Sequence, residues 1–351
     1  MKLPPIDYMP DVRPFAGGIG VIGAGGIVRD AHLPAYKKAG FRVAGICDVL
    51  KPAADAAAGK FGIPFATDDY RRLLERKDVD VVDVAIPDAG RIEVVREAAA
   101  RGKHVLIQKP MAYSVAAARE MVAACRTAGV RLAVNQNARW GPEFRAAWSL
   151  ARSGFLGDVY GIFFDMRNTT DSADWARNGW YAKEERFQIL LWSIHNVDLV
   201  RFIMGREPRR VFASILRKPG QNFRGEVSAT MTLEFEGGRQ AVILDHNASL
   251  PCREGYMRFA VEGTQGMVDA QVSAPRSFEV RHMDDPDAVT RPKLEGEWYP
   301  DGFVGSMADL LNAIAERREP AVSGEDHLKT LGIIEALYRS AAEGVALPPT
   351  A

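Results

Sequence analysis

A glycine-rich turn, an acidic residue at a strand end, a lysine before a proline and a histidine on an apolar helix could do chemistry in this chain. The turn is Gly23-Ala24-Gly25-Gly26-Ile27-Val28, between an expected strand and an expected helix. Glycine lets the backbone approach a pyrophosphate, and the first N–H groups of the helix meet its charge. Val28 departs from the pattern, which has a small residue there, and such a stretch can also be only a turn. The predicted nucleotide-binding residues are Gly23, Gly25, Gly26 and Ile27.

Asp48 ends the next expected strand, 20 residues beyond Val28 (48 − 28). An acidic side chain at this place can accept hydrogen bonds from an adenosine ribose. It would repel the 2′-phosphate of NADP, and Lys51 rather than an arginine follows it. We therefore expect NAD, with NADP as the less favoured cofactor. The alternative is that Asp48 is a solvated turn residue.

Lys109 follows the expected strand HVLIQ and precedes Pro110, which keeps it out of the α region. Ligands of open parallel sheets lie outside the carboxyl ends of the strands. We therefore expect Lys109 to point toward the cofactor, whereas an isolated lysine is ordinarily a surface residue.

His195 lies in the stretch FQILLWSIHNVDLVRFIMG, which predicts a helix. Leu191, His195 and Asp198 share one face of that helix, because residues three and four apart are neighbours. By spacing alone, a histidine in such an apolar stretch is more often a buried core residue than a catalyst.

Strands and helices alternate from residue 17 to about residue 135, which predicts right-handed crossovers and a parallel sheet covered on both faces. The first helix ends at Ala39, and further helices are expected near Lys51–Gly59, Arg91–Arg101 and Ser114–Ala128. The fold class is therefore α/β, with a dinucleotide-binding domain of the Rossmann type over residues 1–135.

Residues 136–351 form the second expected domain, for substrate binding and oligomerisation. Helices are predicted near Pro142–Ser153 and Phe187–Met204, with a strand near Val159–Met166 and a tryptophan-rich loop between. Residues 227–235 alternate apolar and polar, so the sheet here is expected to be open and mostly antiparallel. A last helix is expected to begin after Ser323 and to end at Gly344.

Composition excludes several classes of function. The 351 residues carry 45 Lys+Arg and 45 Asp+Glu, so charge gives no reason to expect nucleic acid or a membrane surface as a partner. No apolar run approaches the ~18 residues of a membrane helix, and the proline-rich start has no signal-peptide core, so the cytoplasm is expected. Scattered histidines predict no metal site, and unpaired spacing predicts buried thiols at Cys47, Cys125 and Cys252.

Taken together, these motifs resemble the glucose–fructose oxidoreductase, inositol dehydrogenase and rhizopine catabolism (Gfo/Idh/MocA) family over nearly the whole chain. GAGGIVRDAHLPAY is similar to the family's nucleotide loop and GKHVLIQKP to its Glu-Lys-Pro strand end. SGFLGDVYGI is similar to the entry to its second domain, IHNVDLVRFIMG to its His-x-x-Asp helix and SGEDHLKTLGIIEALYRSAAEG to its closing helix. The resemblance implies a Rossmann domain followed by an α/β domain with an open sheet.

The resemblance also implies reversible hydride transfer between nicotinamide and a hydroxyl-bearing carbon of a sugar, sugar acid or cyclitol. A secondary alcohol loses hydride readily only as its proton departs, which calls for a base that titrates near neutral pH. His195 matches the family's catalytic histidine, the general acid/base. Lys109 matches the lysine that hydrogen-bonds the reacting oxygen and positions the nicotinamide. Burial near a positive nicotinamide would lower its pKa and could bring it into proton transfer.

Three departures from the family pattern predict that substrate recognition has been rebuilt. The family's Glu-Lys-Pro is Gln108-Lys109-Pro110 here, and Leu191 stands where an aspartate is common. Arg91, after Ile86-Pro87, occupies a place where relatives often have histidine. The resemblance extends the expected cofactor site to Ile86, Pro87, Gln108 and Lys109.

Candidate substrate residues lie in two segments. The segment 167–187 carries Trp175 and Trp180, whose flat rings suit the C–H faces of sugars, and Arg167, which could bind hydroxyls or a carboxylate. The alternative is that these aromatics pack the loop or a subunit contact. Asn137 and Arg139 follow the last Rossmann strand, near where the family's nicotinamide and substrate meet. Asn168, like Arg167, could bind hydroxyls or a carboxylate, whereas Asp245, His246, Asn247 and Lys183 are weaker candidates.

The sequence thus predicts an NAD-dependent dehydrogenase or reductase for a carbohydrate or polyol. A homo-oligomer, either a dimer or a tetramer, is expected because the open sheet needs a cover on its second face. Two alternatives stay open: an NAD-dependent glycosidase of the same family, and a non-catalytic nucleotide-sensing protein.

Overall fold

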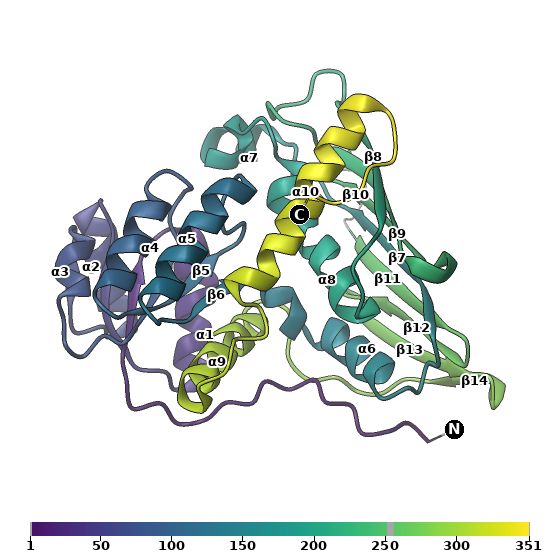
Figure 1. Ribbon diagram of the computed structural model, residues 1–351, viewed down its shortest axis with the longest axis horizontal. Helices are drawn as coiled ribbons and strands as arrows, with labels where there is room; N and C mark the ends of the chain where they lie inside the picture. Colours follow the sequence, from purple (N-terminus) through teal and green to yellow (C-terminus); the bar gives the residue numbers. More distant parts are fainter. Residues whose placement is uncertain (1, 251–255, 351) are drawn as a thin grey trace. The chain divides into compact units, whose positions relative to one another are not determined.

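The computed structural model describes residues 2–250 and 256–350 and divides the chain into two compact units (Figure 1). The first unit contains Met9–Pro142 and Gly296–Leu328. The second contains Met1–Tyr8, Glu143–Glu295 and Lys329–Ala351. Residues 296–328 therefore pack with the N-terminal part of the chain, and we call them the returning segment. The sequence pattern did not predict this.

The first unit is built on a parallel sheet of six strands in the order β3-β2-β1-β4-β5-β6. The chain starts in the middle at β1, builds outward to β3 and then crosses to β4, so the order reverses beside β1. This is the doubly wound order expected from the alternation of strands and helices, and it puts all carboxyl ends at one edge. The strands are β1 Ile19–Ile22, β2 Val43–Cys47, β3 Ala66–Thr67, β4 Val81–Val84, β5 His104–Gln108 and β6 Leu132–Asn135.

The helices of this unit cover both faces of its sheet (Figure 1). Ser114 caps the helix that follows β5, because its side chain accepts a hydrogen bond from the N–H of Ala117. The returning segment supplies one further helix, whose Phe303 ring centroid lies 4.8 Å from that of His32. The helices are α1 Leu33–Ala39, α2 Lys51–Phe61, α3 Tyr70–Leu74, α4 Arg91–Ala100, α5 Val115–Thr127 and α9 Asp301–Glu316.

The second unit is built on a sheet of eight strands in the order β14-β13-β12-β11-β7-β10-β9-β8. All neighbours are antiparallel except β7 and β10, which confirms the mostly antiparallel sheet expected from the alternating residues. The strands are β7 Val159–Arg167, β8 Arg210–Leu216, β9 Ser228–Glu234, β10 Gln240–His246, β11 Tyr256–Gly263, β12 Gly266–Gln271, β13 Ser277–His282 and β14 Asp285–Thr290.

Helices cover one face of this second sheet. Phe144 packs against Phe164 and Phe259, with ring centroids 6.3 and 5.1 Å away. Ser323 accepts a hydrogen bond from the N–H of Asp326 and caps the last helix, as expected. The helices are α6 Pro142–Arg152, α7 Ala173–Asn178, α8 Ile194–Met204 and α10 Gly324–Glu343.

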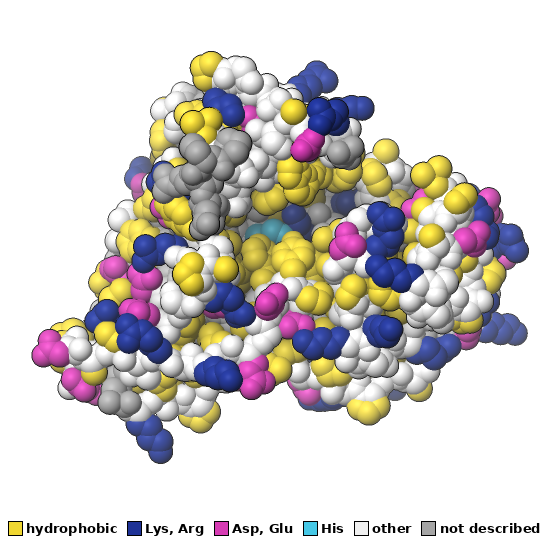
Figure 2. All heavy atoms as spheres, turned by 180° about the vertical axis from the view of Figure 1, so that it is seen from behind, with side chains coloured by type: hydrophobic (Ala, Val, Ile, Leu, Met, Phe, Trp, Pro, Cys, Tyr) yellow, Lys and Arg dark blue, Asp and Glu magenta, His cyan; other side chains and the backbone are white. Residues whose placement is uncertain are grey.

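The surface charges and the described cysteines lie as the composition and the spacing predicted. Figure 2 shows basic and acidic side chains interspersed over the visible face, as zero net charge suggests. Cys47 and Cys125 are buried thiols, whereas Cys252 lies outside the described residues. In the described part of the chain no helix combines the length and apolar character needed to cross a membrane.

Candidate active site

The glycine turn follows β1 at the carboxyl edge of the parallel sheet. Gly23 has φ +109°, and a Cβ there would lie 2.4 Å from the carbonyl oxygen of Ala85, so both conformation and space require glycine. A Cβ at Gly25 would meet no atom within 4 Å, and one at Gly26 would meet only Asp30 at 3.8 Å. At Gly23 the turn packs tightly against the protein, but at Gly25 and Gly26 it is open. A pyrophosphate could there approach the first N–H groups of the π-helical segment Val28–His32, which continues into α1.

Asp48 follows β2 directly and hydrogen-bonds the glycine turn. One carboxylate oxygen accepts the N–H of Ala24 at 2.7 Å, and the other accepts the N–H of Leu50 at 2.9 Å. Lys51, the cation nearest to it in sequence, pairs with Asp55 instead. Asp48 is thus part of the turn, and its negative charge is not matched by Lys51.

Lys109 follows β5 at the same carboxyl edge, as the sequence predicted. Its side chain is half-buried. Burial, followed by the nearby positive charge of Arg91, lowers the pKa of Lys109 from 10.5 to about 7. A lysine with this pKa is partly neutral at pH 7, so its amine could exchange a proton in catalysis.

His195 lies in the second unit, in the first turn of α8, and is 5% exposed. The preceding residues Gln188–Ser193 form a π-helical segment rather than a continuation of the α-helix. The α-helical spacing assumed from the sequence therefore does not hold at Leu191. A π-helical turn is uncommon and frequently occurs at a functional site.

A buried polar network surrounds the start of α8. Both carboxylate oxygens of Asp245 accept hydrogen bonds from the amide of Asn196, at 2.8 and 3.0 Å. Ser193 also bonds Asp245, and the amide of Gln188 donates to Ser193 at 3.2 Å. Burial raises the pKa of Asp245 to about 7 in spite of these bonds. The network holds the two residues on either side of Ile194-His195.

Gln188 and Asn196 were missed by the sequence analysis, and Asp245 was only a weak candidate. A signal was present, since Asp245 falls on the inward face of β10 with Ala241 and Ile243. An acidic residue on the buried, otherwise apolar face of a strand predicts a buried hydrogen-bond partner, because an unpaired buried carboxylate is costly.

Asp198 is buried and accepts a hydrogen bond from the hydroxyl of Thr330 at 3.0 Å. Arg201 also donates to Thr330, and its guanidinium lies 3.7 Å from Asp198. These contacts favour the interpretation that Asp198 braces its helix.

Asn137 and Arg139 are held by the returning segment 296–328. The side-chain amide oxygen (Oδ1) of Asn137 accepts a hydrogen bond from the indole N–H of Trp298 at 3.0 Å. Arg139 is 5% exposed and pairs with Asp326 at 2.8 Å. Both residues thus have structural partners that lie far away in the sequence, and their contact with a substrate stays a prediction.

Trp175 and Trp180 are about half exposed, at 46% and 48%. Each ring centroid lies 5.6 Å from that of Tyr181, which packs inward against Phe187. Tyr181 therefore holds Trp175 and Trp180 in place, and both indole rings keep exposed surface that a ligand could contact. Arg167 pairs with Asp165 at 3.0 Å, so a substrate would have to share it with that carboxylate.

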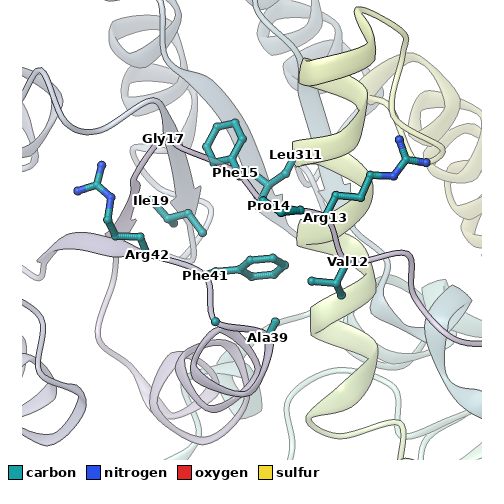
Figure 3. Close-up of a pocket in the computed structure, with 11 residues that line it drawn as sticks. Val12, Arg13, Pro14, Phe15, Gly17, Ile19, Ala39, Phe41, Arg42 and Leu311 are labelled. Atoms are coloured by element: carbon teal, nitrogen blue, oxygen red, sulfur yellow. The ribbon is translucent and has the colours of Figure 1, made fainter.

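A cavity of about 250 Å³ lies elsewhere in the first unit (Figure 3). Its lining includes Phe15, Gly17, Phe41 and Leu311. Gly17 and Ile19 place it at the amino end of β1, whereas the glycine turn and Lys109 lie at the carboxyl edge. This cavity is therefore separate from the candidate active site.

Comparison with known proteins settles the family. Residues 18–136 match the model of an oxidoreductase family with an NAD-binding Rossmann fold, and residues 144–269 match the Gfo/Idh/MocA C-terminal domain. The chain belongs to the Gfo/Idh/MocA oxidoreductase family. Family membership confirms the Rossmann domain, the oxidoreductase class and the NAD cofactor expected from the sequence.

Individual members of the Gfo/Idh/MocA family match almost end to end. D-apiose dehydrogenase of Paraburkholderia graminis is 31% identical, over 95% of this chain and 89% of its own. Inositol 2-dehydrogenase of Rhizobium meliloti is 27% identical, over 92% of this chain and 96% of its own. The crystal structure of an oxidoreductase from Agrobacterium radiobacter, in complex with NAD+, L-tartaric acid and magnesium, superposes with TM-score 0.83 and 26% identity, over 95% of this chain and 98% of that one.

Proposed function

We propose that this protein transfers hydride between NAD and a hydroxyl-bearing carbon of a sugar, sugar acid or cyclitol. The observation that carries the proposal is that the open glycine turn, Asp48 and a lysine of low pKa all lie at the carboxyl edge of one parallel sheet. Relatives named as apiose and inositol dehydrogenases support this substrate class.

The glycine turn fits NAD, because Gly25 and Gly26 leave the room that side chains would fill. Gly23, Gly25, Gly26 and Ile27 would hold the pyrophosphate, and Ile86, Pro87 and Gln108, which follow or end neighbouring strands, would line the cofactor site. Bound NAD supplies the hydride acceptor. His195 would take the hydroxyl proton, and Lys109 would hydrogen-bond the same oxygen, so negative charge on the oxygen is stabilised as the proton leaves.

The test is a panel of sugars, sugar acids and inositols, assayed with NAD by absorbance of NADH. At least one member is expected to give NADH. Bound NAD with no reduction by any member would contradict the proposal. Cleavage of a glycoside without net NADH would identify the NAD-dependent glycosidase instead.

We expect Asp48→Ala to bind NAD about 10-fold or more weakly and to discriminate less against NADP. A hydrogen bond to a charged group contributes about 1.5–3 kcal/mol, and about 1.4 kcal/mol is a tenfold change in affinity. Asp48→Asn is the matched variant: its amide oxygen can still accept the N–H of Ala24, whereas the charge and the acceptor for the N–H of Leu50 are lost. Dissociation constants for both cofactors check this. If both variants prefer NAD to NADP by the same factor as the unaltered chain, Asp48 does not recognise the ribose.

We also expect a homo-oligomer in the cytoplasm, formed through the open face of the second sheet. On that face Phe212, Thr232, Val242 and Phe163 are successive neighbours across four strands. Sedimentation should give a mass that is a multiple of 38.5 kDa. Val242→Glu should lower the measured mass, because a charge in an apolar interface is costly and favours dissociation. A 38.5 kDa species at micromolar concentration would contradict this expectation.

A further inference from the structure

Arg91 is a charged side chain inside the first unit, at the first residue of α4 and only 3% exposed. Burial lowers its pKa to about 10, and Asp88 and Tyr113 act in the opposite direction. Arginine with this pKa is still charged at pH 7. A buried charge is costly unless other groups bond it, so its partners decide what it does.

The partners of Arg91 are backbone carbonyl groups. Its Nε donates to the carbonyl oxygen of Ile86 at 2.7 Å. A terminal nitrogen donates to the carbonyl oxygen of Gln108 at 3.1 Å and also to that of Pro110. Gln108 and Pro110 are the two residues on either side of Lys109, so one guanidinium fixes the backbone before and after the lysine.

The charge of Arg91 also affects the protonation state of Lys109. The positive charge of Arg91 acts together with burial to lower the pKa of Lys109, and the acceptors that Arg91 uses are neutral carbonyl groups. The neighbouring Gln108 is a neutral amide. Like charges disfavour each other most where water is excluded, so the surroundings favour the uncharged amine of Lys109.

We propose that Arg91 is the positioning residue of Lys109: it clamps the carbonyl groups on both sides of the lysine, and its charge favours the neutral form of the lysine amine. The inference rests on the proposed function only for the step in which the amine is used. The clamp itself lies within the first unit, since Arg91 and its carbonyl partners all belong to it.

The experiment titrates Lys109 in the full chain without any substrate. Reductive methylation with ¹³C-formaldehyde makes lysine amines visible to NMR, and absence of one signal in Lys109→Met identifies Lys109. We expect its midpoint near pH 7. In Arg91→Gln it should move upward by about one pH unit or more, because the like charge is gone. Arg91→Lys keeps the charge and should leave the midpoint near that of the unaltered chain.

Arg96→Gln is the matched control, since it removes an arginine from the same helix. Arg96 is exposed and pairs with Glu120 at 2.6 Å, so its loss should leave the Lys109 midpoint unchanged. The positioning role has its own readout in kcat/KM. Arg91→Lys should lower it about 10-fold or more at an unchanged pH midpoint, because a lysine cannot replace the fork that holds the carbonyls.

Two results would overturn the proposal: a Lys109 midpoint near its ordinary 10.5 in the unaltered chain, or equal midpoints in that chain and in Arg91→Gln. The first decides the question even if Arg91→Gln fails to fold. Because the NMR titration needs no substrate, its failure is distinguishable from a failure of the carbohydrate panel.

Discussion

Replacing Lys109 by methionine is expected to lower kcat/KM by about 10²–10³-fold, the usual effect of losing a hydrogen-bond donor to a reacting oxygen. The same change should raise Tm, because the folded chain holds Lys109 against its preference for charge. Its pKa is lowered from 10.5 to about 7, so the unfolded chain binds the extra proton more readily over that range. The destabilisation is fully present below pH 7 and disappears by about pH 10.5. The gain in Tm should therefore be larger at pH 6 than at pH 10.

Activity and melting curves at several pH values check this prediction. Lys60→Met is the matched control, since Lys60 is an exposed lysine on α2 beside the ring of Phe61. It should change neither kcat/KM nor the pH dependence of Tm. Equal melting temperatures for Lys109→Met and the unaltered chain at every pH would show that the lysine is not held in an unfavourable charge state.

The second large effect is expected for His195→Asn, which removes the proposed general acid/base. Loss of such a group typically costs about 10²–10⁴-fold in rate. The affinity for NAD should be nearly unchanged, because His195 belongs to the second unit and the nucleotide-binding turn to the first. Rates with the first substrate found and the dissociation constant of NAD measure the two effects separately.

His282→Asn provides the control, because His282 lies on β13 of the same unit beside Phe155, with ring centroids 4.6 Å apart. It should retain the activity of the unaltered chain. A His195→Asn enzyme with normal kcat/KM would show that His195 is a buried core histidine, as its apolar surroundings alone would suggest.

The placement of the glycine turn, Asp48 and Lys109 at one edge of the sheet was predictable from the sequence, because it depends on short-range order. Each strand and the residue after it, such as Cys47 and Asp48 or Gln108 and Lys109, are contiguous in the chain. Once the alternation of strands and helices predicts a parallel sheet, all strand ends meet at one edge. The requirement for glycine at Gly23 follows from the same turn.

What could not be predicted depends on contacts between distant parts of the chain. Asn137 and Arg139 gain partners from Trp298 and Asp326, and nothing local to either residue indicates that segment. The π-helical turn before His195 was not predictable, because the apolar pattern of these residues favours one continuous α-helix. Arg91 was noted only as a departure from the family pattern, because its carbonyl partners become visible only once the strands are side by side.

The most direct test of hydride transfer follows deuterium from the substrate carbon to the nicotinamide. The purified chain is incubated with NAD and carbon-deuterated members of the carbohydrate panel, and the reduced nucleotide is analysed by mass spectrometry. We expect NADH that carries one deuterium from at least one substrate, and no labelled NADH from Lys109→Met or His195→Asn within the same time. Tight NAD binding with no labelled NADH from any panel member would contradict it.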